Sequence, residues 1–222
     1  MNGFLVAAAF LAFLGIFFDF FDGLLARKLN AQSELGLQLD SLADLVTSGL
    51  VPGVVMLQLI SLAKGSSNFL TEKNEWEIFV QWTGFRIQLL ALLGLLITLA
   101  SAYRLANFNI DENQTDSFIG LPTPANTLLI LSFPLIMEFQ GSDTMNAIIL
   151  NKWVLIGVTL VSCFLLNAKI KLLALKFKNW SFKDNASRYI LLIMAVVLLV
   201  VFKFAAIPLI IIFYIFISLL NK

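Results

Sequence analysis

Apolar stretches, each close to the length of a membrane-crossing helix, run almost end to end through this chain. They cover residues 3–21, 41–62, 85–105, 124–140, 152–168, 188–203 and 204–220. A helix needs about 20 mostly apolar residues to cross the hydrocarbon core of a bilayer. A water-soluble fold of this size could not cover so much apolar surface. The pattern therefore predicts an all-α fold, a polytopic transmembrane helix bundle with about seven spans.

The composition also indicates a membrane protein, and it limits which side chains can bind metals or act as acids and bases. Hydrophobic residues make up 59% of the 222 residues and charged residues only 13%, against about 25% charged in soluble domains. The net charge of +1 gives no argument for binding nucleic acid. Because the sequence has no histidine and a single cysteine, any metal or acid–base chemistry must rely mainly on carboxylates.

No internal repeat or low-complexity tract is visible, and we predict a single membrane domain over residues 1–222. The last two apolar stretches are nearly fused at Lys203, which predicts a C-terminal helical hairpin over 188–220. Gly49 and Gly53 lie four residues apart in an apolar stretch. This spacing permits close helix packing, either within one chain or between two copies.

The basic residues predict the orientation. If residues 22–40 face the cytoplasm, ten of the fifteen Lys and Arg residues fall on that side, as the positive-inside rule favours. The basic segment 169–184 contributes most to this asymmetry. It is interpreted either as an amphipathic stretch on the anionic inner leaflet or as a solvated loop.

Four aspartates lie where the first two apolar stretches meet. Asp19 and Asp22 are three residues apart, and Asp40 and Asp44 are four apart, so each pair shares one helix face. Two helices joined by a polar linker would present the pairs toward each other at the cytoplasmic boundary. A charge at mid-membrane costs about 2.5–3.5 kcal/mol on insertion scales, so such a cluster indicates a function.

Like charges at this density repel one another, and only two basic residues lie within the same stretch. Oxygen ligands without His or Cys suit Mg²⁺, Mn²⁺ or Ca²⁺. The alternative is that the aspartates are helix caps or a solvated loop, but Asp19 and Asp44 lie too far inside the apolar stretches. Gly23 and Gly36 would let a bulky ligand approach the backbone, although Gly36 could equally mark a loop-to-helix junction.

The stretch reads DxxDGxxAR from Asp19 and, after eight further residues, GxxxDxxxD from Gly36. This pattern resembles the signature of the CDP-alcohol phosphotransferase family, and all eight signature positions match at the family spacing. The resemblance implies a polytopic membrane enzyme that moves a substituted phosphate from a CDP-linked donor to an alcohol and releases CMP.

The resemblance also implies roles for the acidic residues. Asp19, Asp22 and Asp40 would bind one or two divalent metals, Mg²⁺ or Mn²⁺ with Ca²⁺ as a further option, on the diphosphate of the donor. Asp44 would help to ligate the metal and act as general base on the incoming hydroxyl group. Both roles match phosphoryl transfer, which depends mainly on positioning and charge neutralisation.

The remaining signature positions would serve the donor. By the same resemblance, Gly23, Ala26 and Gly36 would make room for the nucleotide. Arg27 would support a phosphate or the aspartate network. Outside the signature, Arg104 is a candidate for binding a substrate carboxylate or phosphate, and its alternative interpretation is a positive-inside anchor.

Two segments beyond the signature indicate a branch of the family. RLANFN from Arg104 and GLPTP from Gly120 resemble bacterial phosphatidylserine synthases of the membrane-embedded type. This implies transfer of a phosphatidyl group from CDP-diacylglycerol to L-serine, in a homodimer in the inner membrane of a bacterium, with the active site facing the cytoplasm. Another acceptor alcohol such as glycerol phosphate remains open. So does a divalent-cation transporter, since intramembrane carboxylates occur on ion pathways.

Two departures from the family pattern are visible. Asn107 stands where many relatives carry a second basic residue. Relatives usually carry an amphipathic stretch and a membrane helix before the aspartate-bearing helix. This chain begins inside what would be their second helix, so the comparison predicts that the first family helix is missing from it.

Overall fold

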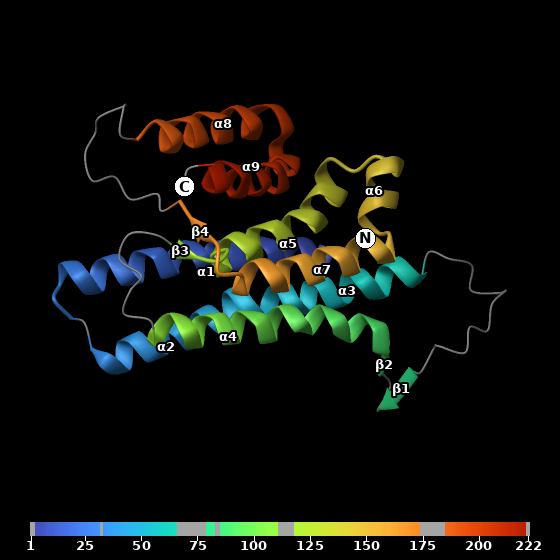
Figure 1. The fold of residues 1–222 in the computed structure, drawn as a ribbon. Coiled ribbons are helices and arrows are strands. Elements are labelled where there is room, and N and C mark those ends of the chain that lie inside the picture. Colours follow the sequence, from blue (N-terminus) through green and yellow to red (C-terminus); the bar gives the residue numbers. More distant parts are fainter. Residues whose placement is uncertain are drawn as a thin grey trace.

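Helices make up nearly all of the part of the chain that a computed structural model describes, which is residues 3–31, 33–65, 79–82, 85–110, 118–173 and 185–220 (Figure 1). The α-helices are α1 (Gly3–Lys28), α2 (Glu34–Leu45), α3 (Val51–Gly65), α4 (Leu96–Ile110), α5 (Thr123–Phe139), α6 (Asp143–Ile149), α7 (Lys152–Asn167), α8 (Ala186–Phe202) and α9 (Ala206–Leu220). Shorter helical turns are η1 (Val46–Leu50), η2 (Leu89–Leu95) and η3 (Lys203–Ala205).

Among the described residues, four short strands form two antiparallel pairs. β1 (Phe79–Trp82) pairs with β2 (Phe85–Gln88), and β3 (Phe118–Ile119) pairs with β4 (Lys171–Leu172). Because the described residues form no larger sheet, the predicted all-α class is confirmed. The third apolar stretch becomes helical only at η2, four residues later than predicted, since its first residues pair with β1.

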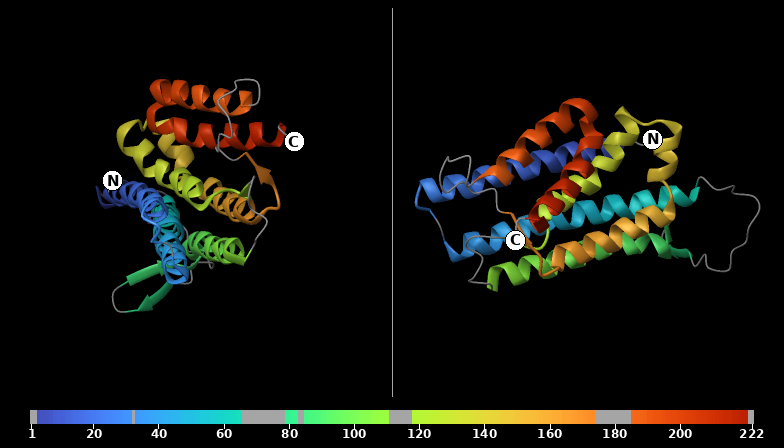
Figure 2. Two further views of the ribbon diagram at one scale, coloured as in Figure 1. Left: turned by 90° about the vertical axis from the view of Figure 1, so that its left-hand side faces the viewer. Right: turned by 45° about the horizontal axis from the view of Figure 1, so that its top comes forward.

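The long helices lie side by side and run between the same two ends of the molecule (Figures 1 and 2). At one end, on the left of Figure 1, α1 ends and α2 begins, and we call this the α1–α2 end. Both α4 and α7 end toward it, and α5 and α8 begin toward it. The chain therefore passes up and down through the bundle and brings distant segments together at the α1–α2 end.

Within the part of the chain that the structure describes, four segments are long and apolar enough to cross a membrane, judged by length and composition. They are Phe4–Ala26, Glu34–Ala63, Leu89–Ile110 and Ala186–Leu220. A fifth is added if α6 and α7, which are bent by 54° relative to each other, count as one span, and α5 is a shorter apolar helix. These helices are typical of a membrane protein. The predicted number of seven spans is not confirmed.

The surface of the bundle also suits lipid. Large apolar side chains such as Phe4, Ile193 and Val200 are exposed, while an inner cluster around Met56 and Leu59 is fully buried. Exposed apolar patches of this extent are unfavourable in water. The outer faces therefore match a hydrocarbon environment, and the inner cluster holds the helices together.

Glycines allow α3 to cross η2 closely. A methyl group at Gly94 would lie 2.9 Å from the Leu57 Cα atom and 3.0 Å from the Gly53 carbonyl oxygen. Gly49 packs in the same way against Ser101 of α4, since a methyl group there would lie 3.2 Å from the Ser101 Cβ atom. Of the two uses considered for Gly49 and Gly53, the structure shows packing within one chain.

Gly94→Ala is expected to destabilise the fold by about 1–3 kcal/mol, because overpacking a tight contact costs that much and the obstructing atoms belong to backbone. The measurement is thermal unfolding of the detergent-solubilised protein. Gly157→Ala is the matched control, since no described atom outside the adjoining backbone of α7 lies within 4 Å of the added methyl group. Equal melting temperatures for both variants would contradict this account of the crossing.

The C-terminal segment folds back on itself, so that α8 and α9 lie next to each other (Figures 1 and 2). The chain turns at η3, where Lys203 has a positive φ of 47°. The side-chain amide of Gln140, just after α5, holds both sides of this turn. It donates to the Phe202 carbonyl oxygen at 2.9 Å and accepts from the Ala205 backbone N–H at 3.1 Å. The hairpin is thus attached to the rest of the bundle.

Candidate active site

The last third of α1 carries the first acidic pair. Asp19 is half-buried and Asp22 is exposed, and the two share one helix face. Asp19 lies within electrostatic range of Asp40 on the next helix as well as of Asp22. Asp19 of this pair therefore lies toward the middle of α2, where Asp40 is located.

The second acidic pair is positioned by the capped start of α2. Ser33 is the N-cap residue, and its hydroxyl oxygen accepts a hydrogen bond from the Gly36 backbone N–H at 3.0 Å. Such a cap fixes where a helix begins and so sets which face carries Asp40 and Asp44. A side chain at Gly36 would crowd the capping hydroxyl, which favours the loop-to-helix interpretation of this glycine.

A bond between side chains ties α2 to α4 beside this pair. The Asn109 Nδ2 group donates to Ser41 Oγ at 2.9 Å, and Ser41 Oγ lies 3.2 Å from Asn109 Oδ1. Ser41 directly follows Asp40. The contact therefore holds the acidic face of α2 in place against α4, the helix that carries Arg104.

The helix widens immediately after Asp44. In the π-helical turn η1, the Val51 backbone N–H bonds to the Val46 carbonyl, five residues back. Hydroxyl groups from two other helices donate hydrogen bonds to backbone carbonyl groups of this turn. Thr98 of α4 donates to the Gly49 carbonyl at 3.1 Å, and Thr127 of α5 donates to the Ser48 carbonyl at 2.9 Å. Turns of this kind are frequent at functional sites.

Two of the acidic residues line one cavity of about 330 Å³. Asp19 of α1 and Asp40 of α2 line it together with Phe20, Gly23 and Leu24. Asp44 is half-buried and lies within electrostatic range of Asp19, Asp40 and Arg104. Carboxylates from two helices and a guanidinium from a third therefore lie within electrostatic range of Asp44 or belong to the same helix face.

Arg104 is held inside the bundle beside Asp44. Its side chain is only 8% exposed. Asp44 and, with a smaller effect, Tyr214 of α9 lie within electrostatic range of its guanidinium group. Its Nε atom is buried and has no hydrogen-bond partner among the described residues. A positive-inside anchor would extend toward water, so this burial favours a role in the site.

The carboxylates suit a hard divalent cation by donor type, because Mg²⁺ and Mn²⁺ prefer oxygen ligands. Two of them also line the same cavity. Within the described ranges, however, no three acidic side chains lie close enough together to hold an ion. Metal binding by Asp19, Asp22, Asp40 and Asp44 therefore stays a prediction that fits the donors present.

The other signature residues lie around the same place. Ala26 is half-buried one turn beyond Asp22, and Arg27 belongs to the last turn of α1, although its side chain lies outside the described part. Asn107 is exposed on α4. Most of the basic segment 169–184 also lies outside the described residues.

Several residues of the site were not predicted. Ser33 could have been, because a serine directly before an acidic first turn is a common helix start. Asn109 and Tyr214 could not have been predicted from local sequence patterns. Asn109 bonds to Ser41, and Tyr214 lies within electrostatic range of Arg104, so both depend on distant parts of the sequence.

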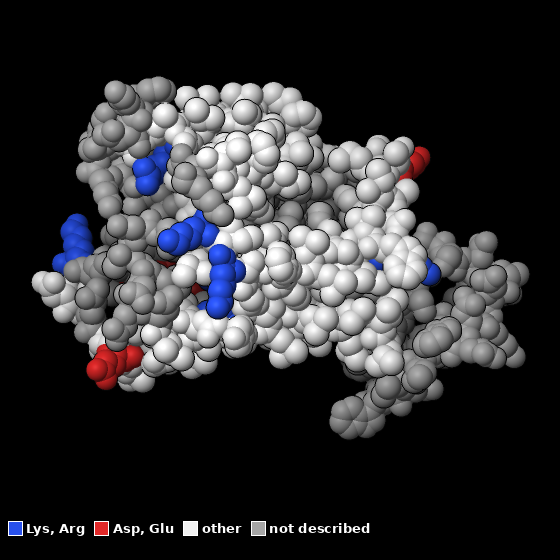
Figure 3. All heavy atoms as spheres, viewed as in Figure 1, with Lys and Arg blue, Asp and Glu red and all other residues white. Residues whose placement is uncertain are grey.

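The surface at the α1–α2 end carries basic side chains near the acids. On the face shown in Figure 3, most of the blue surface lies toward this end. Lys28 ends α1 and is exposed there, as are Lys169 and Lys171 near the end of α7. This positive rim would attract a phosphate-bearing ligand toward the cavity.

Comparison with known proteins gives a family match over residues 1–165, to the model described as CDP-alcohol phosphatidyltransferase. Curated relatives named CDP-diacylglycerol–serine O-phosphatidyltransferase are also similar. The one from Bacillus subtilis is 36% identical over 129 residues, covering 57% of this chain and 60% of its own length. The one from Methanocaldococcus jannaschii is 30% identical over 152 residues, covering 68% of this chain and 59% of its own length.

A third relative of the same name, from Helicobacter pylori, is 30% identical over 162 residues, or 71% of this chain and 59% of its own length. The chain thus spans about three fifths of the length of the curated relatives it matches.

Proposed function

Because the chain belongs to the CDP-alcohol phosphatidyltransferase family, we propose that it transfers a phosphatidyl group from CDP-diacylglycerol to L-serine and releases CMP. The observation that carries this proposal is a cavity lined by Asp19 and Asp40, with Asp44 within electrostatic range of both and of Arg104. The names of the relatives support serine as the acceptor. Another alcohol such as glycerol phosphate is the alternative.

The reaction assigns a task to Asp44. The serine hydroxyl oxygen forms a bond to the phosphorus that bears diacylglycerol, and the bond from that phosphorus to the CMP oxygen breaks. Asp44 accepts the hydroxyl proton as general base, and CMP leaves with the bonding electron pair. Asp44 is half-buried and lies within electrostatic range of Arg104, which supports this role.

Arg104 and the acidic residues would hold the substrates in place. The buried Nε atom of Arg104 provides a donor for a phosphate or for the carboxylate of serine. Asp19, Asp22, Asp40 and Asp44 would hold one or two divalent cations, Mg²⁺ or Mn²⁺, on the diphosphate. When bound, such ions neutralise charge on the diphosphate and on the leaving group.

The membrane arrangement is part of the proposal. We place the α1–α2 end at the cytoplasmic face of a bacterial inner membrane, with seven crossings in a homodimer. The basic side chains at that end support the orientation. The alternating directions of the long helices and the turn between α8 and α9 support the number of crossings (Figure 1).

The test is a reconstitution of the full chain in proteoliposomes with CDP-diacylglycerol and one alcohol at a time. We expect serine to give the fastest CMP release and a chelator to stop it, with Mg²⁺ or Mn²⁺ restoring it. If CMP release with glycerol phosphate or inositol phosphate is as fast as with serine, the assigned acceptor is wrong. CMP release that persists in the chelator would remove the metal from the mechanism.

A further inference from the structure

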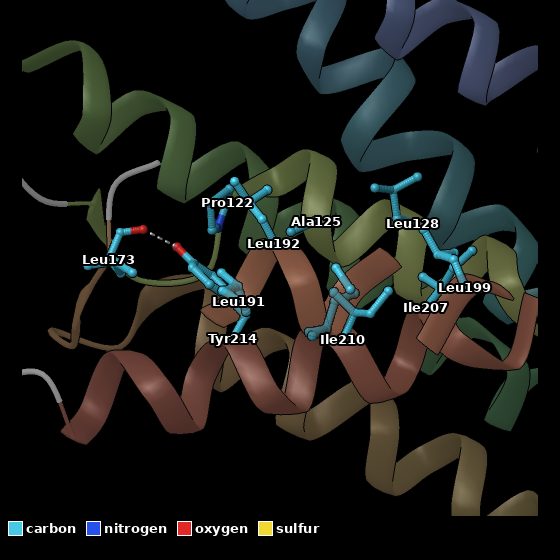
Figure 4. Close-up of a pocket in the computed structure, with 12 residues that line it drawn as sticks. Pro122, Ala125, Leu128, Leu173, Leu191, Leu192, Leu199, Ile207, Ile210 and Tyr214 are labelled. Carbon is cyan, nitrogen blue, oxygen red and sulfur yellow. Dashed lines mark hydrogen bonds between the residues drawn. The ribbon is translucent and has the colours of Figure 1, made fainter. Parts of the chain in front are cut away.

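Tyr214 of α9 is bonded to the segment 168–173, which follows the end of α7. The Tyr214 hydroxyl group donates to the Leu173 carbonyl oxygen at 3.1 Å (Figure 4). One turn further along α9, Ser218 accepts from the Leu173 backbone N–H at 3.1 Å and donates to the Tyr214 carbonyl oxygen at 2.6 Å. Both polar groups of the Leu173 backbone are therefore bonded to α9, which fixes the segment 168–173 against this helix.

The start of the same segment is fixed against α4, close to Arg104. Asn167, the last residue of α7, donates from its side-chain amide to the Ala100 carbonyl oxygen at 3.2 Å. Arg104 lies one helical turn beyond Ala100, toward the α1–α2 end. The segment 168–173 thus connects a point one turn from Arg104 to Tyr214, and these two side chains lie within electrostatic range of each other.

The bond to Leu173 determines how the Tyr214 hydroxyl group can act on its surroundings. A backbone carbonyl can only accept, so the hydroxyl hydrogen is committed to Leu173 and only the lone pairs of the hydroxyl oxygen remain. Arg104 is the complementary group, because a guanidinium has five N–H donors and no acceptor. Its Nε atom is buried without a partner among the described residues. Since electrostatic interactions are stronger in a buried place than in water, a fixed oxygen near this cation favours one orientation of it.

We propose that Tyr214 is a positioning residue, whose hydroxyl oxygen orients the Arg104 guanidinium toward the anionic group of a substrate. The inference rests on the proposed function, since it takes Arg104 to bind a substrate phosphate or carboxylate. Tyr214 lies beyond residues 1–165, which the family model matches. The C-terminal hairpin therefore contributes to a site whose other residues belong to the shared core.

Tyr214→Phe tests the hydroxyl group alone. Tyr214 has the only polar side chain among the described residues that line the apolar groove between α5 and the α8–α9 hairpin (Figure 4), so phenylalanine fits there equally well. In proteoliposomes, KM for the substrate that Arg104 binds should rise about fivefold, as for the loss of one hydrogen bond. Because binding is lost equally in the ground and transition states, kcat should change by less than about twofold. Arg104→Lys, which keeps the charge but loses the planar fork, identifies that substrate by raising the same KM.

Two comparisons separate this role from a structural one. Ser218→Ala removes the other bond between α9 and Leu173 and should lower the melting temperature about as much as Tyr214→Phe, but it should leave both KM values unchanged. In the Arg104→Lys background, Tyr214→Phe should have no further effect on substrate affinity, because the group through which it acts is gone. The melting-temperature shift that each substrate produces also measures affinity, so this comparison does not depend on turnover.

The results distinguish the possible explanations. An equal rise in KM for Ser218→Ala would show that Tyr214 acts by holding the segment 168–173, and the proposal would be wrong. An unchanged KM for Tyr214→Phe, or an effect that persists in the Arg104→Lys background, would overturn it as well. If the unaltered chain releases no CMP with any alcohol, the proposed function is wrong instead.

Discussion

Asp44→Asn is expected to abolish phosphatidyl transfer while leaving donor binding largely intact. The amide keeps the size of the carboxylate but cannot accept the serine proton. General-base catalysis contributes about 10²–10⁴-fold to rate, so CMP release should fall by that factor. The measurements are CMP release in proteoliposomes and the shift in melting temperature that CDP-diacylglycerol produces.

A matched control is available at the opposite end of the bundle. Asp143→Asn makes the same chemical change at an exposed residue in the first turn of α6, and we expect it to retain full turnover. Near-normal turnover by Asp44→Asn would remove this residue from the role of base. Loss of donor binding as severe as the loss of turnover would assign it to binding instead.

Asp19→Ala is expected to lose both donor and metal binding, with donor affinity falling by roughly 10–100-fold, as for the loss of a hydrogen bond to a charged group. Asp19 lines the cavity and lies within electrostatic range of the other three aspartates. The measurement is binding of CDP-diacylglycerol and of Mn²⁺ to the purified variant.

The direction of this change distinguishes two accounts of the acidic cluster. If cations join the carboxylates to the diphosphate, removing Asp19 weakens donor binding. If no cation binds, removing a negative charge relieves repulsion of the diphosphate and strengthens donor binding. Tighter binding of the donor by Asp19→Ala would therefore contradict the metal-binding proposal, and Asp143→Ala again serves as the control.

The helices and their acidic faces could be predicted from the sequence because both depend on local patterns. Long apolar stretches form helices wherever they lie in the fold, and a spacing of three or four places side chains on one face. The pairs Asp19–Asp22 and Asp40–Asp44 followed from this rule. That Asp19 and Asp40, one member of each pair, line a shared cavity could be expected only because a short linker joins their helices.

Other features depend on contacts between distant segments, which no local pattern reveals. Tyr214 of α9 lies within electrostatic range of Arg104, which is 110 positions earlier in the chain. The predicted seven spans came from counting apolar stretches, but α5 has only 17 residues and the α6–α7 pair is bent. Packing between helices determines such lengths and angles, and hydropathy alone does not report them.

The π-helical turn after Asp44 lies between the acidic face of α2 and the tightly packed face of α3. In an uninterrupted helix, the direction of one face would fix the direction of the other. The π-helical turn contains one residue more than an α-helical turn. Gly53 of α3 can therefore pack against Gly94 while Asp40 and Asp44 point in a direction that does not depend on this contact. Removing one residue from Val46–Leu50 would rotate these carboxylates by about 100° relative to α3. The length of this short segment, rather than the packing of α3, therefore determines the direction of the two carboxylates.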